Sequence, residues 1–206
     1  MPTKPKPRSE SCPALGCDQP SKLNQLVVGR GNPRAALMVI GEAPGASEDA
    51  MAVPFVGRSG KLLDRLLISV GFDTEQDVYI CNAVKCRPPK NRRPTSAELL
   101  ACRPWLDQQI ALVDPDVIVL AGATAMEAIL GIKGGISKLR GQWQQWRGRW
   151  LMPLFHPSYL LRNPSEDEGS PVALTRADLI KVQQRLDSLS SGLSVPVLGS
   201  VGGSMR

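Results

Sequence analysis

The sequence ALMVIGEAPG, residues 36–45, decides the fold, because an apolar run ends there in a loop that contains Gly and Pro. A continuous apolar run, rather than an alternating one, is typical of a strand that is buried on both faces of a sheet. Three further runs of this kind follow along the chain, VYICN (78–82), DVIVLA (116–121) and WLMPLF (150–155). We therefore expect four buried strands.

The segments between these runs carry helical signals. Apolar residues recur at helical spacing after the first run, at Leu62, Leu63, Leu66, Leu67 and Val70. Thr95-Ser-Ala-Glu98 is a capping box that opens a second helix, which Pro104 should kink or restart. Two further helices are expected at 122–130 and 175–189. Alternation of strands and helices predicts an α/β fold, a three-layer α/β/α domain with a central four-stranded parallel sheet.

The two ends of the chain differ from this middle part. Residues 1–10 are basic and predict a disordered arm, and residues 188–206 are rich in Ser and Gly and predict a flexible tail. Between them we expect residues 11–187 to form a single domain, since single domains commonly reach about 200 residues.

The composition argues against a membrane protein. No apolar run approaches the roughly 18–20 residues that a membrane span requires. The basic start lacks the apolar stretch of a secretory signal. We expect a soluble cytoplasmic protein that has no membrane partner and acts as a monomer.

The charge is unevenly distributed, with a formal net value of +6. Five cations lie between Lys85 and Arg93 and six between Ala128 and Ser165, and neither stretch contains an acidic residue. Such stretches favour a polyanionic partner, because each phosphate contact releases condensed counterions. A solvated, solubilising face explains either stretch alone equally well. Two of them beside the candidate motifs favour DNA or RNA.

In parallel sheets ligands bind outside the carboxyl ends of the strands, so polar residues there are candidates for a site. The first strand ends in GEAPG (41–45), a tight turn that a ligand can approach closely at Gly41. Glu42 is placed to orient a water or to stabilise positive charge. Phe55, among glycines in the next loop, is either a core residue or a stacking platform. An ordinary strand–helix turn explains the GEAPG loop alone.

Two more strand ends carry candidate residues. Asn82 ends the second strand, and its amide matches the imide edge of a pyrimidine, although Asn here is also a common turn residue. His156, the only histidine, follows the fourth strand. A lone histidine is often structural, but this one could donate a hydrogen bond to an oxygen that gains charge, which is worth about 3–4 kcal/mol. Leu160-Leu161-Arg162 looks like an apolar wedge with a phosphate anchor.

Five cysteines in a cytoplasmic chain argue for metal binding or reactivity before disulfides. Cys12 and Cys17 form one pair near the start, and Cys86 and Cys102 bracket the first basic stretch. Cys81 lies inside a predicted strand, where core packing is expected. Four thiolates can hold zinc or an iron–sulfur cluster, and the spacing does not choose between them. Buried thiols without a metal are the third possibility.

Taken together, these motifs resemble the family 4 uracil-DNA glycosylases, the iron–sulfur branch of the uracil-DNA glycosylase superfamily. The resemblance extends from Cys12 to about Leu186 and is carried by several long motifs in the same order. They are GEAPGASED (41–49), PFVGRSGKLLDRLL (54–67), VYICNAVKCRPPKNRRP (78–94) and FHPSYLLRNPS (155–165).

The resemblance implies a monofunctional glycosylase of base excision repair. Such an enzyme flips uracil out of single- or double-stranded DNA, hydrolyses its N-glycosidic bond and leaves an abasic site. By resemblance, Glu42 positions water or supports the sugar cation, and His156 stabilises the departing uracil anion. Gly41, Phe55 and Asn82 then form the base pocket, in which Phe55 stacks on uracil and Asn82 reads its edge.

The resemblance also implies a DNA contact and a cofactor. Ser158, Leu160, Leu161 and Arg162 would bind DNA, the last three in the minor groove. Cys12, Cys17, Cys86 and Cys102 would ligate a structural 4Fe–4S cluster. The family has C-x-x-C at the first pair, whereas this chain has four residues between Cys12 and Cys17.

Two other functions are compatible with parts of the sequence. A nucleotide or phosphoester hydrolase would use GEAPG as a phosphate loop, with Glu42 and Asp49 on a divalent metal. It requires more clustered carboxylates than the strand ends offer. A non-enzymatic, metal-stabilised DNA-binding module would leave His156 with a structural role.

Overall fold

Four parallel strands form the centre of the computed structural model, which describes residues 26–191. They are β2 (Leu37–Gly41), β3 (Val78–Asn82), β4 (Val117–Ala121) and β6 (Arg149–Leu154). Parallel pairing joins β3 to β2, β2 to β4 and β4 to β6. All four expected strands are therefore present. Cys12, Cys17, the basic arm and residues 192–206 of the expected tail lie outside the described residues.

The sheet has six strands rather than the expected four, in the order β1-β3-β2-β4-β6-β5. The two additional strands are antiparallel and lie at the edges: β1 (Arg30–Gly31) beside β3 and β5 (Gln144–Trp146) beside β6. They are two and three residues long and polar in part, so no apolar run in the sequence predicts them.

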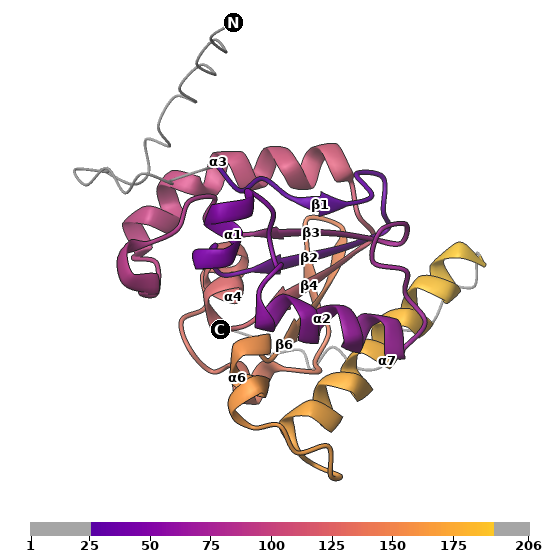
Figure 1. The fold of residues 1–206 in the computed structure, drawn as a ribbon. Helices are drawn as coiled ribbons and strands as arrows, with labels where there is room; N and C mark the ends of the chain where they lie inside the picture. The colour runs from indigo at the N-terminus through magenta and orange to yellow at the C-terminus, as the bar shows by residue number, and fades with distance from the viewer. Residues whose placement is uncertain (1–25, 192–206) are drawn as a thin grey trace, which may run out of the picture.

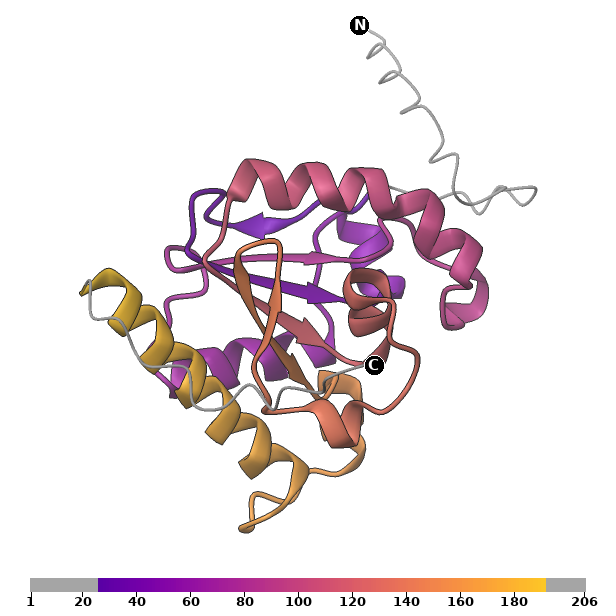
Figure 2. The ribbon, with the colours of Figure 1, turned by 180° about the vertical axis from the view of Figure 1, so that it is seen from behind.

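Helices cover both faces of the sheet, as the three-layer prediction requires (Figures 1 and 2). They are α1 (Ala46–Met51), α2 (Arg58–Ser69), α3 (Ser96–Val113), α4 (Ala123–Leu130), α5 (Ile136–Leu139), α6 (Pro157–Arg162) and α7 (Pro171–Ser190). Because side chains alternate along a strand, Met38 and Ile40 pack on one face with α3 and α4. Leu37 and Val39 pack on the other with α2, α6 and α7.

Two helices differ from expectation. Helix α3 is continuous through Pro104, so the chain does not restart there. Helix α7 begins at Pro171, because Ser170 caps it by accepting a hydrogen bond from the Ala173 backbone N–H at 3.2 Å. The same helix ends at Ser190, so residues 188–190 are helical and do not belong to the tail. None of the helices in residues 26–191 combines the length and apolar character that a bilayer crossing requires.

The strand order places a crevice between the carboxyl ends of β2 and β4. From β2 the chain moves to β3 on one side, whereas β4 lies on the other side and leads on to β6. The loops after β2 and β4 therefore diverge, which is the arrangement that binds ligands in open α/β sheets. The predicted site residues follow β2, β3 and β6 at this end of the sheet.

Candidate active site

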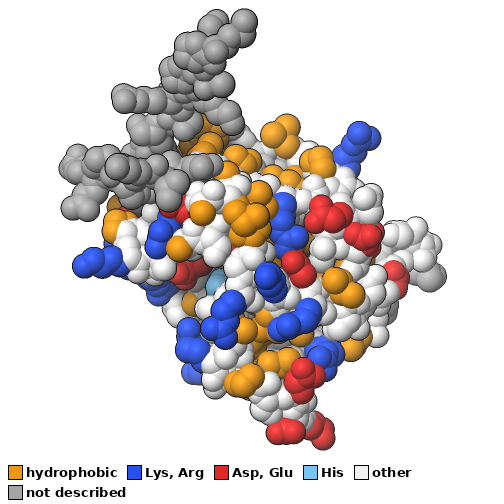
Figure 3. Space-filling model, viewed as in Figure 1, with side chains coloured by type: hydrophobic (Ala, Val, Ile, Leu, Met, Phe, Trp, Pro, Cys, Tyr) orange, Lys and Arg blue, Asp and Glu red, His pale blue; other side chains and the backbone are white. Residues whose placement is uncertain are grey.

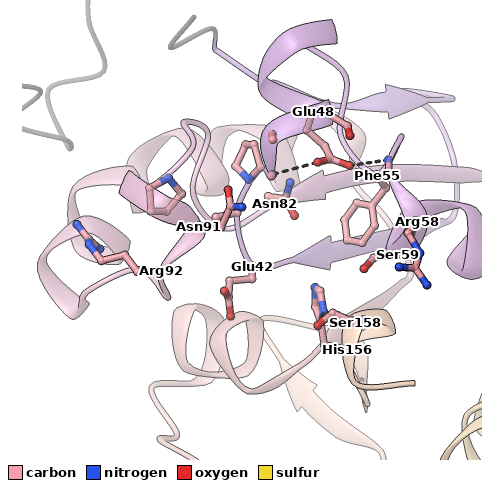
Figure 4. Close-up of a pocket in the computed structure, with 17 residues that line it drawn as sticks. Glu42, Glu48, Phe55, Arg58, Ser59, Asn82, Asn91, Arg92, His156 and Ser158 are labelled. Carbon is pink, nitrogen blue, oxygen red and sulfur yellow. Dashed lines mark hydrogen bonds between the residues drawn. The ribbon is translucent and has the colours of Figure 1, made fainter. Parts of the chain in front are cut away.

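A cavity of about 440 Å³ opens at the carboxyl ends of the parallel strands (Figure 4). Glu42, Phe55, Asn82, His156 and Ser158 all line it, so five of the predicted residues meet in one place. Of the residues that were not predicted, the cavity is also lined by Glu48, Arg58, Ser59, Asn91 and Arg92. These come from α1, the start of α2 and the segment before α3.

Gly41 lies behind the cavity where two lining side chains converge. A Cβ atom at this position would lie 2.3 Å from Cζ of Phe55 and 2.6 Å from Oδ1 of Asn82. Gly41 is also the register partner of Asn82 at the end of the β2–β3 ladder. A glycine is needed here because the ring and the amide approach the backbone more closely than any side chain allows.

The Phe55 ring is held in a strained backbone conformation. Phe55 has φ +56°, a left-handed value that is uncommon outside glycine, and its side chain is buried. Gly60 permits this turn, because a Cβ there would lie 1.7 Å from the Phe55 carbonyl oxygen. The ring centroid lies 6.2 Å from that of His156, with the planes tilted by 38°. The ring is thus fixed on one wall of the cavity.

Glu48 clips the loop of Phe55 to the GEAPG loop. Its Oε1 accepts hydrogen bonds from the backbone N–H groups of Val56 at 3.0 Å and Gly57 at 2.8 Å. Its Oε2 accepts from the Gly45 N–H at 3.1 Å (Figure 4, dashed lines). Sequence reasoning assigned no role to Glu48, although the spacing from Gly45 to Glu48 is that of a helix N-cap and its N3 residue.

Asn82 is buried at the end of β3, with its amide at the cavity. Below it, Lys85 is buried, and its Nζ donates a hydrogen bond to the Asn82 carbonyl oxygen at 2.6 Å. Lys85 was counted in the basic stretch that favours a polyanionic partner, but its burial keeps it from such a contact. Its charge supports the strand end that carries Asn82.

The hydrogen bonds of His156 fix the tautomer of its ring. The backbone N–H of Ser158 donates to Nδ1 at 3.2 Å, and the Ser158 hydroxyl lies 2.8 Å from the same nitrogen. Because a backbone N–H can only donate, Nδ1 carries no proton. In the neutral ring the proton is therefore on Nε2, which becomes a hydrogen-bond donor.

Burial also keeps this ring neutral. Desolvation lowers the pKa of His156 below the ordinary 6.5; the negative charge of Glu42 opposes this shift and the positive charge of Arg162 adds to it. At neutral pH the ring is consequently an uncharged donor. Such a donor can stabilise an oxyanion that forms at the cavity.

Glu42 projects from the end of β2 and is held by a partner from a distant part of the chain. The Thr124 hydroxyl, in the first turn of α4, donates to Glu42 Oε2 at 2.5 Å. Thr124 was not predicted from the sequence, because candidate residues were assigned only after the first, second and fourth strands. The carboxyl-end rule applied to β4 (Val117–Ala121) leads directly to Gly122-Ala-Thr124.

Positive side chains surround the entrance to the cavity. Figure 3 shows the single histidine in a hollow with Lys and Arg side chains along one edge. Arg58 and Arg92 are exposed and line the cavity itself. Part of the charge of the basic stretch is paired, since Arg92 contacts both carboxylate oxygens of Glu98, at 2.6 and 2.7 Å.

Helix α6 places the predicted DNA-binding residues differently from expectation. Leu160 is completely buried and packs in the core with α2 and α7, so its prediction as part of an exposed wedge is wrong. Leu161 is half-buried and Arg162 is exposed. A surface formed by these two residues and the exposed Tyr159 remains beside the cavity. The helical spacing explains the error, because adjacent leucines on a helix face different directions.

Three cysteines lie in the described residues, and all are buried. Cys81 is a core residue of β3, as expected, and burial raises the pKa of its thiol. Cys86, after β3, and Cys102, in α3, belong to one cluster of buried side chains. Two thiols are half the number that a four-cysteine iron–sulfur cluster requires. Within residues 26–191 no group of three or more His, Cys, Asp or Glu side chains could hold a metal ion.

The described chain begins beside these two cysteines. The Val27 N–H donates to the Lys85 carbonyl oxygen at 2.8 Å, one residue before Cys86, and Leu26 packs against the same buried cluster. Residue 26, which follows the segment that contains Cys12 and Cys17 in the sequence, therefore lies beside the buried side chains that include Cys86 and Cys102. The residues present fit a four-thiolate site in this respect.

The comparisons with known proteins agree with this geometry. A family model of the uracil DNA glycosylase superfamily matches residues 28–180. The chain belongs to this superfamily. A type-4 uracil-DNA glycosylase of Thermotoga maritima is 50% identical over 152 residues, which cover 72% of this chain and 79% of the relative. The type-4 enzyme of Sulfurisphaera tokodaii is 40% identical over 68% of this chain and 67% of its own length. That of Saccharolobus solfataricus is 39% identical over 79% of this chain and 76% of its own length.

Superfamily membership confirms the resemblance of the sequence motifs to the uracil-DNA glycosylases. The contacts of the carboxylates that follow β2 argue against a phosphoester hydrolase. Both oxygens of Glu48 accept backbone hydrogen bonds. Asp49 is buried, with Arg87 at 3.9 Å from its Oδ2. Asp49 does not line the cavity beside Glu42, and residues 26–191 contain no group of three or more side chains that could hold a metal ion.

Proposed function

We propose that this chain removes uracil from DNA by hydrolysing the N-glycosidic bond, as a monofunctional glycosylase of base excision repair. One observation carries the proposal: a neutral His156 with its proton on Nε2 shares a cavity with Glu42, Phe55 and Asn82. These side chains are suited to bind a base, to recognise its edge and to stabilise it as it leaves as an anion. Membership of the superfamily supports the same activity.

Binding requires that the nucleotide leave the helix, because a base inside a duplex cannot be reached. Flipping costs a few kcal/mol, which contacts in the pocket must offset. In the proposed complex the uracil stacks on Phe55, and the Asn82 amide pairs with its imide edge through one donor and one acceptor. Gly41 permits both contacts, because it leaves the ring and the amide close together.

Bond cleavage leaves negative charge on uracil, mainly at its O2 atom. The Nε2–H of His156 donates a hydrogen bond to that oxygen as the bond breaks. A preorganised donor of this kind contributes about 10²–10³ in rate.

Glu42 acts on the attacking water and on the sugar. In the proposed mechanism its carboxylate positions the attacking water and stabilises the positive charge that develops on the sugar. No lysine lines the described cavity, so a Schiff-base intermediate has no candidate nucleophile there. The product is therefore an abasic site with an intact backbone.

The side chains around the entrance would hold the DNA. Arg58, Arg92 and Arg162 are exposed near the cavity and would contact phosphates, and Ser158 would assist them from the start of α6. Leu161 would enter the minor groove in place of the flipped base. We further propose that the enzyme accepts single- and double-stranded DNA and works as a monomer in the cytoplasm.

The proposal is tested by release of uracil from single- and double-stranded oligonucleotides in the presence of EDTA. We expect release from both substrates, followed by strand cleavage only after alkali. Absence of uracil release would contradict the glycosylase, and loss of activity in EDTA would favour a metal-dependent hydrolase. Light scattering of the same preparation reports the mass of the particle.

We also propose that Cys86 and Cys102, together with Cys12 and Cys17, hold a 4Fe–4S cluster. When bound, such a cluster would tie the start of the chain to the domain and so add to its stability. Anaerobically purified protein should be brown, with an absorbance that dithionite or air alters. Cys102→Ser should lose colour and thermal stability, whereas Cys81→Ser should keep its colour. A colourless protein that contains zinc would contradict the cluster.

A further inference from the structure

A chain of hydrogen bonds runs outward from the proposed catalytic carboxylate. Thr124 donates its hydroxyl proton to Glu42 Oε2 at 2.5 Å, and Arg93 Nε donates to Thr124 Oγ1 at 3.0 Å. Thr124 is 2% exposed, so these two partners contact the hydroxyl in a buried environment. The three residues come from the loop after β2, the start of α4 and the basic stretch before α3.

The chemistry of the three groups sets the direction of the chain. A guanidinium has donors and no acceptor, so Arg93 must donate to Thr124. That bond occupies a lone pair of the hydroxyl and leaves its single proton to point at Glu42. An ionised carboxylate only accepts, so each bond in the chain has one possible direction, and the two bonds strengthen each other.

Arg93 is itself held at the far end. Its Nη2 contacts Glu127 Oε2 at 2.8 Å, and the Ser96 hydroxyl donates to Glu127 Oε1 at 3.0 Å. Glu127 lies one helical turn after Thr124 in α4. The arginine is therefore anchored on the same helix as the threonine that it orients.

The Thr124–Glu42 bond lies where the sheet no longer joins the two segments. The pairing of β2 with β4 ends at Ile40 and Leu120, and the two segments of the chain diverge beyond this pair. Across this gap the hydroxyl fixes one oxygen of Glu42 and leaves the other for a water molecule. A carboxylate that must aim a water requires such a fixed orientation.

From this arrangement we infer that Thr124 is a positioning residue of the active site, oriented by Arg93, which holds Glu42 in its working geometry. The inference rests on the proposed function for the role of Glu42 in the reaction. The hydrogen bond itself is independent of that role. The two parts can therefore be tested separately.

The test compares Thr124→Val, which removes only the hydroxyl, with Thr124→Ser, which retains it. Thr175→Val is the matched control, because Thr175 is also buried and its hydroxyl donates to the Pro171 carbonyl oxygen at 2.7 Å, away from the cavity. Each variant is made in the natural chain and in Glu42→Ala. Single-turnover uracil release at saturating enzyme and Tm are measured for all of them.

We expect Thr124→Val to slow release by about ten- to hundredfold, the loss typical of a hydrogen bond to a charged group. Thr124→Ser should recover most of the rate, and Thr175→Val should keep it. In the Glu42→Ala background, Thr124→Val should have no further effect on rate, and the two changes in Tm should not add. An equal loss in both backgrounds, or no rescue by serine, would overturn the inference.

The Tm cycle also separates this inference from the proposed function. If the natural chain releases no uracil, the glycosylase is contradicted, and additive Tm changes would then overturn the Thr124–Glu42 coupling as well. If uracil is released and Glu42→Ala acts at full rate, Glu42 has no catalytic role and the inferred role of Thr124 is wrong.

Discussion

His156 and Glu42 face the same cavity, but the groups that orient them differ in kind. His156 is held by Ser158, two residues further along the chain, through both its backbone N–H and its hydroxyl. Glu42 is held by the hydroxyl of Thr124, which is 82 residues away in the sequence. One orientation is local and partly made by the backbone, and the other depends on a tertiary contact between side chains.

This difference follows from what each group has to do. The imidazole needs one tautomer and no charge, and a helix N-terminus with a buried ring provides both. The carboxylate of Glu42 must remain accessible to water while one of its oxygens is fixed. In the structure this oxygen is fixed by a side chain from another helix, Thr124 of α4. We therefore expect His156 to tolerate the loss of its hydrogen-bonding side chain, Ser158, better than Glu42 tolerates the loss of Thr124.

The largest effect is expected from His156→Ala. Removal of the proposed donor should lower the single-turnover rate of uracil release by about 10²–10³. DNA binding, measured by fluorescence anisotropy with an uncleaved analogue, should change little, because phosphate contacts supply most of the affinity. Equal losses in rate and in binding would favour a DNA-binding module in which His156 is structural.

Gly122→Ala should disturb the His156 side through packing alone. The added Cβ would lie 2.8 Å from the His156 Cβ, and Gly122 has φ +97°. We expect a loss of about hundredfold in rate, which is typical of a displacement near 1 Å. Gly131→Ala is the matched control at the other end of α4, with φ +71° and open space around it. It should cost about 1 kcal/mol of stability and leave the rate unchanged.

The pH dependence should reveal the charge coupling between the two sides. Since burial lowers the pKa of His156, the ring should be protonated, and activity lost, only below pH 6.5. Between pH 6.5 and the lower pKa of the folded state, the folded state binds fewer protons than the unfolded state, so the free energy of unfolding falls as the pH falls through this range. NMR titration of the single histidine measures this pKa directly.

Two variants separate the contributions to this pKa. Glu42→Gln removes a negative charge that raises it and should move the titration to lower pH. Arg162→Gln removes a positive charge that lowers it and should move the titration upward. A histidine that titrates above 6.5 in the natural chain would contradict the neutral donor.

The same contrast explains what could be predicted from the sequence. Buried apolar strands and the carboxyl-end rule brought Glu42, Asn82 and His156 to one cavity, because each signal is confined to a few adjacent residues. The support of His156 is equally local. The same rule leads to Thr124 after the third strand, but its contact with Glu42 is recognised only when the neighbours of β2 in the sheet are known.

Errors in the prediction share this origin. Leu160 was assigned to a wedge and Lys85 was counted in the basic stretch from residue type, although helix direction and a strand-end carbonyl place both in the interior. The edge strands β1 and β5 were missed because pairing with a neighbour, rather than an apolar run, defines them. Tertiary context decided each of these cases, and a single sequence does not contain it.

The smallest effect is expected from Ser158→Ala, which is the most direct test of the contrast. The substitution removes the hydroxyl at 2.8 Å from Nδ1 and leaves the backbone N–H at 3.2 Å in place. The tautomer should persist, with ¹⁵N shifts that still report a protonated Nε2, and the rate should fall by only about fivefold, the value of one ordinary hydrogen bond. A loss as large as that expected for Thr124→Val, or a change of tautomer, would show that the hydroxyl rather than the backbone holds the ring.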